Sequence, residues 1–251
     1  MTPRSDHYHI ILLSAGSGTR MGTSEKKQFL SLNGSPLFVW AVRAFLTLIE
    51  DCSISLYLTH SPGDLTRFRD LLSEHLNPDH VDLIRLIEGG STRSESVYHA
   101  LREVQATANS SDIVLIHDCA RPFIQKADID RLMDTLCTHK AATLGYSITD
   151  TFKKVDSPGQ VIVEHIDRDT LRGILTPQGF RFDLLWQAYE AYMKSPYPVT
   201  DDTELVEALG IPVTVVESDR RNIKITRPDD LTMAELYIEL LPQGDGDSKH
   251  S

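Results

Sequence analysis

The chain has 251 residues, of which 41% are hydrophobic, enough apolar side chain to build the core of one α/β domain of generous size. Its formal net charge is −11 at pH 7, which argues against nucleic acid as a partner, because phosphate backbones are bound by clustered Lys and Arg. The longest apolar stretch, residues 37–49, is broken by Arg43 and is too short to cross a membrane. Any anionic ligand must therefore be small and be met by local positive charge.

The remaining global features predict a cytoplasmic protein. Cys52, Cys119 and Cys137 are an odd number of cysteines without the spacing of metal ligands. The N-terminus has no apolar segment followed by a small-residue cleavage site.

Runs of β-forming residues alternate with helix-like segments through the first part of the chain. The predicted strands are residues 9–14, 53–59, 81–87, 113–117 and 141–147, and the predicted helices lie near residues 36–49, 63–75, 91–107 and 126–139. This alternation predicts a largely parallel sheet with helices on both faces. Such sheets bind ligands at the carboxyl ends of their strands.

The pattern changes over residues 147–176, where two short extended pieces flank the turn-forming sequence Asp156-Ser157-Pro158-Gly159. We predict a projecting β-hairpin arm. A hairpin with little core of its own is only marginally stable, so we expect the arm to pack on a second subunit in a homodimer.

The chain then returns to the first pattern. Helices are predicted at 181–193, 202–209 and 228–241, and strands at 212–216 and 222–226. We expect a single domain over residues 1–241, followed by a disordered tail at 242–251 that is rich in Gly, Asp and Ser.

A glycine-rich turn, Ser14-Ala15-Gly16-Ser17-Gly18-Thr19-Arg20-Met21, follows the first strand, and Lys26 and Lys27 come soon after it. Such a turn lets backbone N–H groups approach a phosphate, and the cations add charge. The segment lacks the Gly-Lys-Ser/Thr of a P-loop, and its third glycine, Gly22, comes one place late for a dinucleotide fingerprint. We interpret it as a triphosphate cradle; the alternative is a tight turn with ordinary surface cations.

Three further segments hold candidate site residues. Asp118, in HDCARP at the end of the fourth strand, is placed to hold Mg²⁺ together with substrate phosphates, unless it only caps a helix. The glycine turn at 88–96 opens a helix whose backbone and hydroxyl groups suit a base or ribose. Lys224 is predicted on a strand, where a plain surface lysine is the alternative.

Seven motifs follow one another over about residues 9–240: LSAGSGTRMG with KKQFL, EGGSTRSESV, HDCARPF, DT with DR, LTPQGF, TDDTELVE and NIKITRPDDL. In this order they resemble the 2-C-methyl-D-erythritol 4-phosphate cytidylyltransferases of the non-mevalonate isoprenoid pathway. The resemblance implies a Rossmann-like fold, a homodimer with interlocking arms, and Mg²⁺, CTP and methylerythritol phosphate as ligands.

The resemblance also assigns roles to residues of this chain. It implies that Arg20, Lys27 and Lys224 are catalytic and that Asp118 binds the metal. The nucleotide-binding positions are Ser14, Ala15, Gly16, Gly18, Gly90, Ser91, Ser96 and Cys119. The sugar-phosphate positions are Thr151 and Arg168 on the arm, acting across the dimer, and Thr176.

The chain departs from the family pattern at four places. Ser14 and Cys119 stand where the family has Ala, Lys26 where Pro is common, and Arg221 where an acidic residue commonly precedes NIK. The first three are small changes at positions read through the backbone, or an added charge. Arg221 puts in question the local support of Lys224.

The implied reaction is attack by the phosphate oxygen of methylerythritol phosphate on the α-phosphorus of CTP, with loss of pyrophosphate. A phosphate nucleophile is already anionic, so catalysis must come from positioning and charge stabilisation rather than from a general base. Two alternatives remain: a sister cytidylyltransferase acting on ribitol 5-phosphate, and a nucleotide-binding protein without transfer activity.

Overall fold

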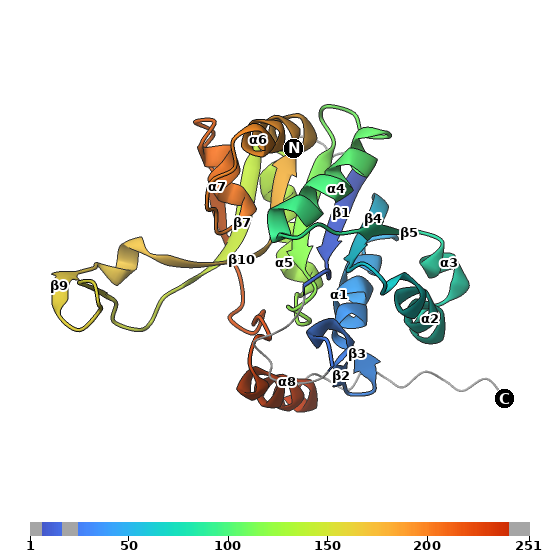
Figure 1. Ribbon diagram of the computed structural model, residues 1–251, viewed down its shortest axis with the longest axis horizontal. Coiled ribbons are helices and arrows are strands. Elements are labelled where there is room, and N and C mark those ends of the chain that lie inside the picture. Colours follow the sequence, from blue (N-terminus) through green and yellow to red (C-terminus); the bar gives the residue numbers. More distant parts are fainter. Residues whose placement is uncertain (1–6, 17–24, 241–251) are drawn as a thin grey trace.

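A seven-stranded sheet forms the centre of this computed structural model, which describes residues 7–16 and 25–240 (Figure 1). In the order in which they lie side by side, the strands are β11 (Thr214–Glu217), β7 (Ala141–Ser147), β10 (Arg172–Arg181), β6 (Ile113–Asp118), β1 (His7–Leu13), β4 (Ser53–His60) and β5 (Ile84–Glu88). β10 runs antiparallel to both of its neighbours, and the other pairs are parallel. The predicted mostly parallel sheet is confirmed.

Helices cover both faces of the sheet, as the alternating pattern predicted. The apolar cluster on one face includes side chains of α1 (Leu37–Leu46), α2 (Leu65–His75) and α5 (Lys126–Leu136). The cluster on the other face includes those of α4 (Arg93–Gln105), α6 (Phe182–Lys194) and α7 (Asp202–Glu207). Successive residues of β1 serve the two faces: Ile10 packs in the first cluster and Ile11 in the second, as side-chain alternation requires.

A smaller apolar cluster holds the last helix against the body. α8 (Pro228–Leu240) contributes Ala234, which packs with Leu32, Leu37, Phe123 and Ile225. Leu32 belongs to a small hairpin of β2 (Ser31–Leu32) and β3 (Ser35–Pro36), which follows the 3₁₀ turn η2 (Lys27–Phe29). This packing fixes the residues around Lys27 and Lys224 on the same side of the protein.

The strand order places a topological switch point next to β1. The chain passes from β1 to β4 on one side and later returns to β6 on the other. The carboxyl ends of β1 and β6 are in register, with Leu13 opposite Asp118. Open α/β sheets bind ligands in the crevice at such a point.

The arm is shorter than predicted. Residues 172–176, which the sequence pattern assigned to the arm, belong to β10, where Leu175 and Thr176 are buried. The projecting part therefore covers residues 148–171 and contains the hairpin of β8 (Lys153–Val155) and β9 (Ile162–His165), which extends far from the body in Figure 1. Another 3₁₀ turn, η3 (Arg168–Thr170), leads back to the sheet.

Two predicted strands differ in the structure. Residues 222–226 join no sheet, and the segment is held instead by a hydrogen bond from Ile225 N to Ala120 O of 2.8 Å. The strand predicted at 81–87 begins only at Ile84, because Pro78–Val81 forms the short helix α3. Proline at the first position of a helix favours this start.

The longest helices of the described part, α4, α6 and α8, have 13 residues each. None of the described helices is long and apolar enough to span a membrane. The cytoplasmic location stays a prediction.

Candidate active site

A cavity of about 450 Å³ opens at the carboxyl ends of β1 and β6. Residues 13–16 and 118–120 border it from these two strands, and residues 90–93 and 96 border it from the turn before α4 and its first turns. Lys27 and Lys224 bring two cations to its wall. Of the predicted site residues, the cavity is lined by Ser14, Ala15, Gly16, Lys27, Gly90, Ser91, Ser96, Asp118, Cys119 and Lys224.

The other predicted site residues lie elsewhere. Gly18 and Arg20 fall outside the described residues. Thr151 and Arg168 are exposed on the arm and do not line the cavity of their own chain. Thr176 is buried behind Asp118 rather than on the cavity surface.

Close backbone packing joins the two glycine turns of the cavity. A Cβ on Gly89 would lie 2.5 Å from Ala15 Cβ, and one on Gly90 would lie 2.3 Å from Glu95 Cβ. Only glycine lets the turn approach so closely at both positions. The loop after β1 is tied to β4 as well, since Ser14 N donates to Thr59 Oγ1 at 3.0 Å.

Hydroxyl groups fix the start of α4 beside this turn. Thr92 caps the helix by accepting from Glu95 N at 3.1 Å, and Glu95 Oε2 accepts from Ser91 N at 2.7 Å. Ser96 Oγ accepts from Gly90 N at 3.0 Å and donates to Thr92 O at 2.9 Å. Gly90, Ser91 and Ser96 are thus held in one rigid turn on the cavity wall.

Asp118 is shared between two cations. Its Oδ2 accepts from Lys224 Nζ at 2.6 Å, and its Oδ1 lies 3.3 Å from Arg93 Nε. Burial opposes ionisation of the carboxyl, but the charges of Arg93 and then Lys224 outweigh it and hold the pKa of Asp118 well below its usual range. The cavity therefore contains a permanent carboxylate whose charge is balanced on both sides.

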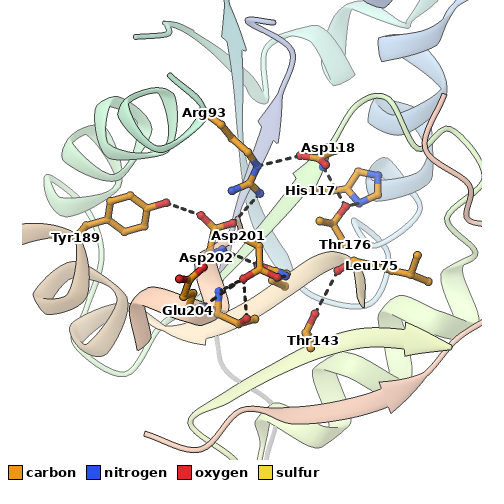
Figure 2. A network of polar contacts seen from close by, with 12 residues as sticks. Arg93, His117, Asp118, Thr143, Leu175, Thr176, Tyr189, Asp201, Asp202 and Glu204 are labelled. Atoms are coloured by element: carbon orange, nitrogen blue, oxygen red, sulfur yellow. Dashed lines mark hydrogen bonds and ion pairs between the residues drawn. The ribbon is translucent and has the colours of Figure 1, made fainter. Parts of the chain in front are cut away.

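Arg93 also contacts a second carboxylate, that of Asp202, at 2.7 Å from its NH2 nitrogen (Figure 2). Asp202 is buried and also accepts a short hydrogen bond from the Tyr189 hydroxyl. Despite burial, which opposes its charge, the carboxylates of Asp202 and Asp118 raise the pKa of Arg93. Arg93, Tyr189 and Asp202 were not among the predicted site residues. The sequence signals for two of them were the arginine in STRSES and the acidic pair in TDDTELVE.

Hydrogen bonds of Asn222 hold the segment before Lys224 in place without the side chain of Arg221. Asn222 Nδ2 donates to Thr176 O at 2.8 Å, and Arg121 NH1 donates to Asn222 O at 2.8 Å. Arg221 instead pairs with Asp219 at 2.6 Å on the exposed side of the loop. The departure from the family pattern at Arg221 therefore leaves the support of Lys224 intact.

Thr176 and His117 form a buried support behind Asp118, also visible in Figure 2. Asp118 N donates to Thr176 Oγ1 at 3.1 Å, and the Thr176 hydroxyl lies 3.0 Å from His117 Nδ1. His117 Nε2 lies 3.0 Å from Arg121 O, which can only accept, so Nε2 carries the proton and Nδ1 accepts from Thr176. Burial lowers the pKa of His117 to about 4, so the ring stays neutral near pH 7.

The buried state of His117 predicts a loss of stability in acid. Its pKa is about 4 in the folded protein and 6.5 ordinarily, so the unfolded chain binds the extra proton as the pH falls through this window. Wild type should lose unfolding free energy when the pH is lowered from about 7 to about 4.5. In His117→Gln, which lacks the titrating ring, we expect this loss to be smaller by about 2 kcal/mol. Urea unfolding of both proteins at the two pH values measures the difference; equal losses would contradict the assignment.

The donor set of the cavity suits a metal that is held mainly by its substrate. Among the described residues, no group of three or more His, Cys, Asp or Glu side chains forms a metal cage. Among the residues that the structure describes, Asp118 is the one Asp or Glu that lines the cavity. Mg²⁺ commonly binds one or two carboxylates together with substrate phosphates, so a single carboxylate fits this mode.

A second cavity of about 630 Å³ lies on the other side of Lys224. Arg121, Arg220, Tyr146 and Tyr237 contribute to its lining. Lys224 lines both cavities. Lys224 thus borders both the cavity with the glycine turns, where its amine contacts Asp118, and a second recess to which two arginines contribute.

Comparisons with known proteins agree with this geometry. A family model for 2-C-methyl-D-erythritol 4-phosphate cytidylyltransferase matches residues 8–240. The protein of that name from Geobacillus thermodenitrificans is 38% identical over 232 residues, covering 92% of this chain and 97% of the relative. The one from Geobacillus kaustophilus is 39% identical with the same coverage.

Two solved structures extend the comparison to the fold. The 4-diphosphocytidyl-2C-methyl-D-erythritol synthase of Anaerococcus prevotii is 28% identical with a TM-score of 0.77, covering 93% of this chain and 99% of that one. The 2-C-methyl-D-erythritol 4-phosphate cytidylyltransferase of Thermus thermophilus is 29% identical with a TM-score of 0.70, covering 91% and 98%. The chain therefore belongs to the 2-C-methyl-D-erythritol 4-phosphate cytidylyltransferase family.

Proposed function

We propose that this protein transfers CMP from CTP to 2-C-methyl-D-erythritol 4-phosphate, giving 4-diphosphocytidyl-2-C-methyl-D-erythritol and pyrophosphate. One observation carries the proposal: Lys27, Asp118 and Lys224 meet around a single cavity at the switch point of the sheet. A triphosphate needs cations there, and a metal needs the carboxylate. Membership of the family supplies the substrates.

The nucleotide is proposed to lie along the rigid glycine turns. Gly90, Ser91 and Ser96 supply N–H and hydroxyl groups for the cytidine, and Ser14, Ala15 and Gly16 supply backbone groups for the phosphates. Cys119 lines the same wall, where burial raises the pKa of its thiol, so it acts as a small neutral side chain. Gly18 and Arg20 are proposed to complete the phosphate cradle.

Lys224 is proposed to act between nucleotide and acceptor. The acceptor phosphate is anionic near neutral pH and needs no base, but it must approach an equally anionic triphosphate. An amine held beside Asp118, on a residue that borders both cavities, reduces this repulsion and stabilises the charge that spreads over the α-phosphate oxygens. Thr176 supports this arrangement from behind Asp118.

Asp118 is the proposed ligand for Mg²⁺, with the phosphates of CTP completing its shell. The bound ion would neutralise charge on the phosphate oxygens. Each oxygen of Asp118 contacts one cation and keeps a further lone pair, so Asp118 could hold the ion while Lys224 and Arg93 stay in contact with it.

Pyrophosphate release tests the function directly. Purified protein is incubated with Mg²⁺, CTP and either methylerythritol phosphate or ribitol 5-phosphate, and separately without acceptor. We expect release that depends on CTP, metal and methylerythritol phosphate. Faster release with ribitol phosphate would reassign the acceptor, and equal release without acceptor would remove the transfer reaction. If ATP or GTP replaced CTP equally well, the proposal that residues 90–96 recognise cytidine would be wrong.

The arm is proposed to hold two subunits together and to bring Thr151 and Arg168 to the partner's site. Both strands of its hairpin are exposed along their whole length, and Val161, Ile162 and Val163 are 59%, 62% and 56% exposed. A two-stranded hairpin is marginally stable alone, so an apolar surface of this size favours a second copy as its cover.

Ile162→Asp should weaken this dimer, because it places a charge in the apolar contact. We expect the dimer dissociation constant, measured by light scattering over a dilution series, to rise at least about tenfold. Leu236→Asp is the matched control, since Leu236 is a 49% exposed apolar residue on α8. A dimer that is unaffected by Ile162→Asp, or a monomer in wild type, contradicts the role of the arm.

A further inference from the structure

Asp118 divides its two oxygens between two cations, although one of these cations could occupy both. Lys224 Nζ lies 2.6 Å from Oδ2, and Arg93 Nε lies 3.3 Å from Oδ1. A guanidinium group forks readily onto both oxygens of one carboxylate. Something must therefore hold Arg93 back from the more common bidentate contact.

Asp202 is the group that holds it. Its Oδ2 lies 2.7 Å from the NH2 nitrogen of Arg93, and its side chain is 1% exposed. Its other oxygen accepts the hydrogen bond from the Tyr189 hydroxyl. Figure 2 shows Arg93 lying between Asp118 and Asp202, with Tyr189 on the far side of Asp202.

The backbone of Asp202 is anchored in the sheet. Asp202 N donates to Gln178 Oε1 at 3.0 Å, and Gln178 Nε2 donates to Asp201 Oδ2 at 2.9 Å. Asp201 also caps α7 by accepting from Thr203 N at 3.1 Å. Because Gln178 lies on β10, directly beside β6, the start of α7 is fixed relative to the strand that carries Asp118.

We propose that Asp202 is a positioning residue for the transfer reaction: by holding one end of Arg93, it restricts Arg93 to one oxygen of Asp118 and leaves the other to Lys224. The chain of contacts alternates in charge from Lys224 through Asp118 and Arg93 to Asp202. Removing the last charge lets Arg93 take both oxygens of Asp118 and displaces the amine of Lys224. The kinetic consequence rests on the proposed function, whereas the displacement does not.

Asp202→Asn tests the displacement with little change in shape. Lys224 is labelled with a limiting amount of acetic anhydride, and its acetylation is quantified by mass spectrometry relative to the exposed Lys194 in the same molecule. An amine that loses its carboxylate contact reacts faster, so we expect labelling of Lys224 to rise at least about twofold. The kcat should fall roughly 10- to 100-fold, as for other residues that orient site groups from behind, while KM for CTP changes little.

The double variant Arg93→Gln/Asp202→Asn should shift the labelling in the opposite direction. It leaves Lys224 as the partner of Asp118, so labelling of Lys224 should fall below the wild-type value, while kcat stays low. It also removes both charges of the Arg93–Asp202 pair together, so neither is left without its partner. This variant therefore decides the question if Asp202→Asn does not fold.

Asp183→Asn is the matched control, because it removes an Asp–Arg pair of 2.8 Å, with Arg181, outside the cavity. Asp183→Asn should leave both the acetylation of Lys224 and the kcat unchanged. Unchanged labelling of Lys224 in both site variants would overturn the proposal, and so would a rise in both, since that indicates general loosening. The labelling needs no turnover, so failure of the cytidylyltransferase assay and failure of this inference are separate results.

Discussion

Lys224→Ala should lower kcat by about 10²-fold or more, the cost of removing a preorganised charge from the developing transition state. The amine contacts Asp118 on the wall of the main cavity, so its charge is close to any phosphate bound there. The effect on folding should be about 1 kcal/mol or less, because Lys224 is 37% exposed and Arg93 still neutralises Asp118. Steady-state kinetics and thermal melts of the same preparation separate the two effects.

Lys126→Ala is the matched control for this change. Lys126 is 40% exposed and contacts the carboxylates of Asp51 and Asp130 at 2.6 and 2.9 Å, but it lies outside the cavity. The Lys126→Ala variant should have a slightly lower melting temperature and full activity. If Lys224→Ala keeps kcat within a few-fold of wild type, the amine has no part in charge stabilisation.

Local sequence pattern predicted most of the sheet because most of its strands are buried apolar runs. β6 is buried along its whole length, and β1 nearly so, which gives the continuous hydrophobic signal of a central parallel strand. β10 was missed for the opposite reason. Its sequence contains Thr176-Pro177-Gln178-Gly179, which has turn-forming composition, and it becomes a strand through pairing with β6 and β7.

The glycine turn at residues 88–96 is a weak signal by itself, and the family resemblance singled out Gly90, Ser91 and Ser96 as nucleotide-binding positions. The structure brings these three residues together on the cavity wall, while their role stays a prediction. Contacts between distant segments leave no such local signal. Arg93 and Asp202 are 109 positions apart, and Asp118 and Lys224 are 106 apart, so only the folded sheet brings them together.

The end of the arm likewise depends on contacts between residues that are distant in the sequence. Its exposed apolar strands and its turn were recognisable, but the point where it rejoins the sheet depends on the pairing of Arg172 with Ser147 and of Gly173 with Tyr146. Gly173 permits this approach, since a Cβ there would lie 2.4 Å from the Tyr146 ring. Pairing across 25 or more residues leaves no local signal in the sequence.

Lys27 also lines the main cavity, and its position is fixed by the residues that follow it. η2 is closed by Phe29 N donating to Lys26 O at 2.9 Å, and Phe29 packs against Phe38 and Phe68 in the core. Lys26, its neighbour, turns to Asp64 at 2.6 Å and does not line the cavity. The two adjacent lysines therefore differ in role although they are alike in type.

Lys27→Ala should lower kcat by about 10²-fold or more, because the charge of Lys27 is needed most when the α-phosphorus gains a fifth ligand and negative charge spreads over its oxygens. Lys27→Arg should rescue poorly, since a planar fork does not replace a compact ammonium in a confined turn. Lys26→Ala is the matched control and should keep kcat within a few-fold of wild type. Pyrophosphate kinetics beside thermal melts give the result. A Lys27→Ala protein that melts and turns over like wild type would remove Lys27 from the mechanism, and a loss of equal size in Lys26→Ala would show that the whole loop, rather than one amine, is required.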